Sequence, residues 1–114
     1  MEVTFKQLYE ANSALKEIYK KEVPIKASLK LLELIKEVDT KIILAEEKRQ
    51  ELVIKYKDTK ENKVADDNLE MFKKEFFEML EAKTQINWEP VDPEFFGDCK
   101  ISTEVISKIR FLLM

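Results

Sequence analysis

The sequence contains no histidine, a single glycine and a single cysteine among its 114 residues. Without histidine the chain lacks the commonest general base and metal ligand, and Ser-His and Cys-His nucleophile pairs are excluded. One glycine is too few for a P-loop or a G-x-G-x-x-G dinucleotide fingerprint. Glycine and proline together number four, so tight turns are scarce, which argues against an all-β fold.

The cysteine count and the hydropathy pattern limit the setting in which we expect the protein to act. Cys99 has no second cysteine to pair with, which predicts a cytosolic protein. The negative charge of Asp98 disfavours its thiolate, so we favour a structural or incidental role for this residue. No apolar stretch approaches the roughly 20 residues of a membrane span, and Phe111-Leu112-Leu113-Met114 is far too short.

The net charge is −3 and is unevenly distributed along the chain. Residues 1–60 carry 13 basic and 11 acidic side chains, whereas residues 61–114 carry 7 and 12. Neither half is basic enough to follow a phosphate backbone, so we expect no nucleic-acid partner. The acidic half suits either a solvated helix face, which we favour, or a basic partner surface.

Helical periodicity dominates the first half of the chain. Thr4 followed by Gln7 forms an S/T-x-x-E/Q capping box and predicts a helix over about 4–20. Pro24 ends this segment and suits the first turn of a second helix, predicted over about 24–57. At 1.5 Å per residue that helix spans about 50 Å. Its apolar stripe alternates at spacings of four and three and comprises Leu31, Ile35, Val38, Ile42, Ala45, Arg49, Leu52 and Tyr56.

Residues 58–66 are polar and predict a loop, and Asp67 with Glu70 resembles a second capping box that opens a helix over about 67–82. The first and third helices together match the length of the central one. Because short connections make sequential helices antiparallel neighbours, we expect each to cover one half of it. The alternative is that the central helix also pairs with its copy in a homodimer.

The C-terminal third changes character. Residues 84–91 alternate polar and apolar, which predicts a short strand with residues 2–5 as its mate. Gly97-Asp98 suits a turn, and Ser102 or Thr103 suits the cap of a last helix. The sequence therefore predicts one mainly α domain over 1–114, a three-helix antiparallel arrangement around a long central helix, with a short extended segment and a short C-terminal helix.

Carboxylates cluster at Glu46-Glu47, Asp66-Asp67 and Asp92/Glu94, but 23 acids in 114 residues produce such clusters by chance. Asp66-Asp67-Asn68-x-Glu70 lacks the alternating ligands and central glycine of an EF-hand, and helix capping explains it better. We therefore predict no catalytic residue, no metal site and no cofactor. Arg49, the polar member of the stripe, is expected to snorkel or to pair locally with Glu46 or Asp67.

Large apolar side chains on irregular segments are the candidates for partner binding, because interface hot spots are built from such anchors. The competing and favoured interpretation is that they complete the core. The candidates are Trp88, Phe95, Phe96, Phe111, Leu112 and Met114.

Several short motifs, in order and covering most of the chain, resemble a family of small proteins encoded by tailed phages and prophages. They are Val3-Thr4-Phe5-x-x-Leu8, Val23-Pro24-x-Lys26-Ala27, Glu51-Leu52-Val53-x-Lys55-Tyr56, Phe72-x-x-Glu75-Phe76-x-x-Met79-Leu80, Ile86-x-Trp88-Glu89-Pro90 and Ile101-Ser102. The resemblance implies a phage protein in a bacterial cytoplasm and transfers no functional residue.

We therefore expect a non-enzymatic protein that acts by docking to a phage or host protein, either as an assembly helper or as an inhibitor of a defence component. The alternative is a homodimeric structural protein with no separate partner.

Overall fold

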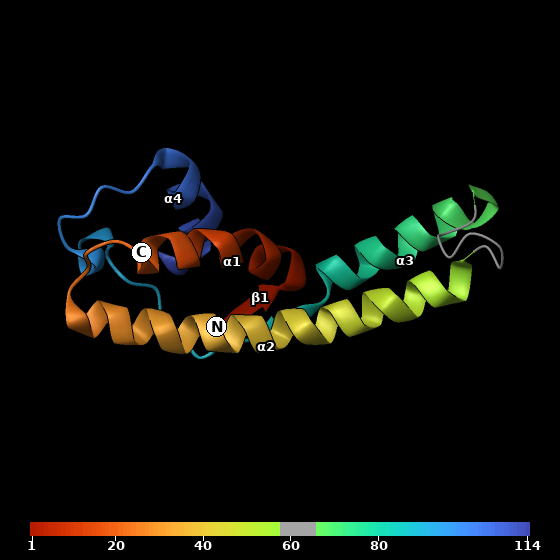
Figure 1. The fold of residues 1–114 in the computed structure, drawn as a ribbon, viewed down its shortest axis with the longest axis horizontal. Coiled ribbons are helices and arrows are strands. Elements are labelled where there is room, and N and C mark those ends of the chain that lie inside the picture. Colours follow the sequence, from red (N-terminus) through yellow and green to blue (C-terminus); the bar gives the residue numbers. More distant parts are fainter. Residues whose placement is uncertain (58–65) are drawn as a thin grey trace.

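The computed structural model describes residues 1–57 and 66–114. Within these ranges it has four α-helices and a two-stranded sheet (Figure 1). Three short 3₁₀ turns are η1 (Asp66–Asn68), η2 (Pro93–Phe96) and η3 (Arg110–Leu112). The predicted mainly helical fold around one long helix is confirmed, and the predicted loop lies, up to residue 65, outside the described residues. The elements in chain order are β1 (Glu2–Thr4), α1 (Phe5–Tyr19), α2 (Ile25–Tyr56), α3 (Leu69–Glu81), β2 (Lys83–Gln85) and α4 (Thr103–Ile109).

Side-chain caps fix the start of α1, as the sequence predicts, and of α4, where Ser102 is the cap out of the two predicted candidates Ser102 and Thr103. The Thr4 hydroxyl accepts from the Gln7 N–H at 3.2 Å, and the Gln7 side-chain oxygen accepts from the Thr4 N–H at 2.9 Å. The Ser102 hydroxyl accepts from the Val105 N–H at 3.2 Å. Each cap satisfies N–H groups that have no partner within the helix.

The predicted capping box at Asp67 is wrong. The turn η1 leads directly into α3, so Asn68 occupies the cap position, and its side chain makes no capping hydrogen bond. The Asn68 amide instead donates to the Tyr56 carbonyl at 3.3 Å. This contact ties the start of α3 to the end of α2.

Helix α2 is the spine of the molecule, which measures 53 × 24 × 22 Å. Its 32 residues are covered in tandem by α1, with 15 residues, and by α3, with 13 (Figure 1). Short α4 lies on α1, on the side away from α2 (Figure 1). The half of α2 that follows Pro24 therefore belongs to a body of three helical layers, α2, α1 and α4. The C-terminal half of α2 is covered by one helix, α3.

The two-stranded sheet pairs the start of the chain with the segment after α3. Strands β1 and β2 are antiparallel, with Val3 opposite Thr84. The mate is the predicted one, but β2 is shorter than the strand expected over 84–91. Beyond Gln85 the chain leaves the strand so that Ile86 and Trp88 both enter the core, while the Asn87 N–H donates to the Glu37 carboxylate at 2.9 Å.

Burial is strongly uneven along the molecule. A single cluster of sixteen buried side chains draws on β1, α1, the first half of α2, the segment 86–96 and α4 with η3. In the distal arm, which we define as residues 40–56 of α2 together with α3, only Ala45 and Leu52 are buried. No side chain of α3 is buried. The arm is therefore a two-helix hairpin attached to a well-packed body.

The turn at Gly97 should tolerate no side chain. Its φ is +73°, and a Cβ there would lie 2.9 Å from Cδ of Pro24. We predict that Gly97→Ala lowers the free energy of unfolding by about 1–3 kcal/mol, from left-handed backbone strain and the contact with Pro24. Urea unfolding measures this, with the exposed neighbour substitution Asp98→Ala as control. Equal stability of the two variants would contradict the prediction.

Candidate protein-docking groove

An open groove runs between α2 and α3 along the distal arm. Two adjoining hollows of about 280 and 470 Å³ share Lys48, Glu51 and Met79 in their lining. Apolar side chains line the groove from both helices and from the start of α1: Phe5, Leu44, Ala45, Leu52 and Met79. We call this feature the α2–α3 groove.

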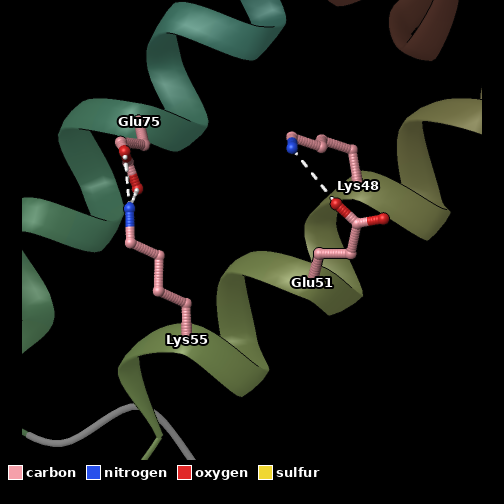
Figure 2. Close-up of polar contacts among 4 residues, drawn as sticks. All are labelled: Lys48, Glu51, Lys55 and Glu75. Carbon is pink, nitrogen blue, oxygen red and sulfur yellow. Dashed lines mark hydrogen bonds and ion pairs between the residues drawn. The ribbon is translucent and has the colours of Figure 1, made fainter.

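Charged side chains form the rim of the α2–α3 groove. Figure 2 shows Lys55 of α2 reaching Glu75 of α3, with its ammonium 3.1 and 3.3 Å from the two carboxylate oxygens. The hydrogen bond to Glu75 raises the pKa of Lys55. Lys48 pairs with Glu51 on the same helix at 3.1 Å (Figure 2). All four side chains are substantially exposed, so these pairs orient the rim and add little stability.

An apolar floor with a rim of both charge signs matches the grooves that bind an amphipathic helix. Apolar side chains elsewhere on the arm are exposed as well. Leu44, which lines the groove, is 58% exposed. Outside the groove lining, the exposed apolar residues are Leu69, Met71 and Phe77 of α3, at 37, 52 and 57%, and Ile43 and Ile54 of α2, at 60 and 64%. A hairpin with so little buried surface gains stability when a further helix covers it.

The aromatic partner-binding candidates lie mostly in the body rather than in the groove. Trp88 and Phe96 are buried, and the Trp88 indole N–H donates to the Leu112 carbonyl at 3.0 Å. Phe95 is partly buried and meets both rings edge to face, at 6.2 Å from Trp88 and 5.5 Å from Phe96. These contacts favour the core interpretation of the three aromatic residues.

The C-terminal candidates divide between core and surface. Leu112 is buried, Phe111 is partly buried, and Met114 is 84% exposed. The Met114 N–H donates to the Val91 carbonyl at 2.9 Å, so the tail is held against the 86–96 segment. Whether any of these residues contacts a partner stays a prediction, and Met114 is the one whose side chain is accessible.

Arg49 pairs locally, as predicted, and the pair extends to α1. Its Nε donates to the Glu46 carboxylate at 2.8 Å, and the Tyr9 hydroxyl donates to the other oxygen of Glu46 at 2.8 Å. Burial and then the bond to Glu46 raise the pKa of Tyr9 to about 12. The bonds from Tyr9 and Arg49 lower the pKa of Glu46. This junction fastens α1 to α2 where the body meets the distal arm.

The other polar features have structural roles. The Cys99 thiol donates to the Phe96 carbonyl at 3.3 Å and is only partly exposed. Over residues 1–57 and 66–114 no three acidic or cysteine side chains converge in the manner of metal ligands.

The α2–α3 groove was not identified from the sequence as a binding site. The sequence predicts that the apolar positions of α3 pack against α2, and most of them are only partly exposed. The signal was the breadth of the apolar surface on both helices, including Phe77 beside the α3 stripe. A helix with so broad an apolar face expects more than one neighbour.

None of the helices in the described parts of the chain is long and apolar enough to cross a membrane. The chain matches no protein-family model, no curated protein and no solved structure.

The burial of Trp88 predicts a stability role. We expect Trp88→Ala to lower the free energy of unfolding by about 3–5 kcal/mol, since it removes a core ring and one of the two hydrogen bonds to the Leu112 carbonyl, which keeps the bond from the Val91 N–H. Thermal unfolding followed by circular dichroism measures this. Met114→Ala, an exposed control, should leave the midpoint unchanged, and a similarly small effect at Trp88 would contradict its core role.

The Glu46 junction predicts a pH-dependent contribution to stability. Because the folded-state pKa of Glu46 lies below its ordinary 4.5, its contribution is present above pH 4.5 and is lost as pH falls through the folded value. Wild type should therefore exceed Glu46→Gln in stability at neutral pH and converge with it in acid. Urea unfolding across the acid range tests this, with Glu47→Gln as control. A difference that stays constant with pH would contradict the assignment.

Proposed function

We propose that the protein is a non-enzymatic binding module that acts by docking its distal arm to another protein. The observation that carries the proposal is the exposed apolar surface of α3, a helix with no buried side chain in which Leu69, Met71 and Phe77 are exposed. Exposed apolar surface of this extent marks interaction sites on soluble proteins.

The groove supports a specific mode of docking. An amphipathic helix of the partner would lie between α2 and α3, with its apolar side chains over Leu52 and Met79. On the rim, Lys48 is paired with Glu51 of α2 and Lys55 with Glu75 of α3, and Glu78 also lies on the α3 side. A partner helix with both acidic and basic residues beside its apolar face would exchange these exposed pairs for pairs across the interface.

The biological setting of the proposal rests on the sequence resemblance alone. The similarity to small proteins of tailed phages suggests a phage or prophage protein in the bacterial cytoplasm. Its partner is then either a phage protein whose assembly it assists or a host protein, such as a defence component, that it inhibits. The alternative is a homodimeric structural protein with no separate partner.

Affinity capture from infected or lysogenic cells tests docking through the groove. Leu44 lines the groove and is 58% exposed, so Leu44→Glu places a charge there without disturbing the buried core. We expect wild-type protein to capture a stoichiometric partner and Leu44→Glu to lose about 90% or more of it, as for a hot-spot substitution. A capsid or tail protein would indicate assembly, and a defence protein inhibition.

Ile106→Glu is the matched control, because Ile106 is an exposed apolar residue on α4, remote from the groove lining. This variant should retain the captured partner. Equal capture by both variants would place the binding surface elsewhere, and capture of nothing by wild type would contradict the proposed function.

A further inference from the structure

Helix α3 has much less buried contact with its neighbours than α1 has. Five side chains of α1 are buried, whereas α3 has none. The best-covered apolar side chains of α3 are Phe72, Phe76, Met79 and Leu80, and each is only partly buried. Because hydrophobic stabilisation scales with the apolar area removed from water, α3 gains less of it from its place on α2 than α1 does.

The polar contacts between α3 and α2 do not make up the difference. The side chains of Lys55 and Glu75 are 58 and 33% exposed, and exposed ion pairs contribute little to stability. The Asn68 amide reaches the Tyr56 carbonyl at 3.3 Å, which is long for a hydrogen bond. Helix α3 is therefore attached to α2 by partial apolar cover and two weak polar contacts.

The sequence of α3 does not stabilise the helix by itself either. Asn68 makes no capping hydrogen bond, and the last turn contains no basic side chain. Glu78 and Glu81 stand in that turn instead, where their charges oppose the partial negative charge of the helix end. At 13 residues α3 is also within the length at which isolated helices are marginal in water. A detached α3 should therefore unwind.

The chain that follows α3 is anchored to the body without help from α3. The Phe5 N–H donates to the Ala82 carbonyl at 3.1 Å, and the Ile86 N–H donates to the Met1 carbonyl at 2.9 Å. Between these bonds β2 pairs with β1. Ala82 has extended backbone, with φ −61° and ψ 142°, so the helix ends sharply before the strand. Helix α3 can consequently leave α2 while the sheet stays intact, with Ala82 as the hinge.

From the weak attachment, the weak helix ends and the anchored hinge we infer that α3 is a strap, which detaches from α2 and unwinds as one unit while the body stays folded. Elements with few buried contacts open in this way at free energies well below that of global unfolding. Opening uncovers Leu52 on α2 together with Phe72 and Phe76, whose rings stack at 5.9 Å in the closed strap. The inference concerns the free protein and does not rest on groove docking.

Hydrogen exchange of the full chain, resolved by residue and corrected for intrinsic rates, tests the strap. We expect amides of α3 to be protected about a hundredfold or more weakly than those of α1 between Leu8 and Ile18. Low urea should hardly change the exchange of α3, because opening exposes little surface, but should speed that of α1. Equal protection and equal urea dependence in the two helices would overturn the inference.

Two neighbouring phenylalanines of α3 provide a matched pair of variants. Phe76 is partly buried, so Phe76→Asp opposes closure of the strap, whereas Phe77 is 57% exposed and Phe77→Asp should leave the strap closed. We expect Phe76→Asp to lose the helical circular dichroism of the 13 residues of α3. The single tryptophan, Trp88, is buried in the body and should keep its emission.

Two results for Phe76→Asp would contradict the strap. One is an unchanged helical signal, and the other is a loss of helix accompanied by exposure of Trp88, since the body would then unfold together with α3.

The exchange and capture experiments separate the strap from the proposed function. If α3 is as well protected as α1 while Leu44→Glu loses capture, the strap fails and groove docking stands. If α3 exchanges early and the wild type captures nothing, the strap stands and groove docking fails.

Discussion

The structure depends on the burial of the inner apolar stripe of α2, a helix more than twice as long as any other element. Neither α1 nor α3 is long enough to cover it alone, so the two lie on it in tandem. Their order along α2 follows from the short connections, which make each an antiparallel neighbour of the end it follows or precedes. The elongated shape is a direct consequence of this arrangement.

The two halves of α2 are covered unequally, because only the half under α1 has a third layer, α4, above it. Helix α4 packs on α1, and the Trp88–Phe96 segment and β1 contribute to the same buried cluster. The distal arm has α3 alone, held by the Lys55–Glu75 pair, the Asn68 amide and contacts among partly covered apolar side chains. Most of the hydrophobic stabilisation therefore belongs to the body, and the arm keeps exposed apolar surface.

The junction of Tyr9, Glu46 and Arg49 marks the boundary between the two halves. It shows how a charged residue is accommodated at a stripe position of α2, since Arg49 and the Tyr9 hydroxyl of α1 each bond one oxygen of the Glu46 carboxylate. The same helix has apolar residues on its outer face as well. The chain buries one of these faces, and several apolar residues of the other face are exposed.

Local sequence signals determined the helices, their order, the caps at Thr4 and Ser102, the turn at Gly97 and the pairing of the first strand with the segment after α3. These features depend on neighbouring residues or on matched lengths, which the sequence displays directly. Three features depended on tertiary contacts instead. They are the cap of α3, the early end of β2 and the burial of the aromatic residues. Trp88 and Phe96 enter the core because α4 and η3 close over them, and no local pattern distinguishes a buried anchor from an exposed one. The α2–α3 groove is likewise a tertiary feature. It stays open because α4 packs on α1 and does not cover α3, and this arrangement depends on the packing of the whole chain.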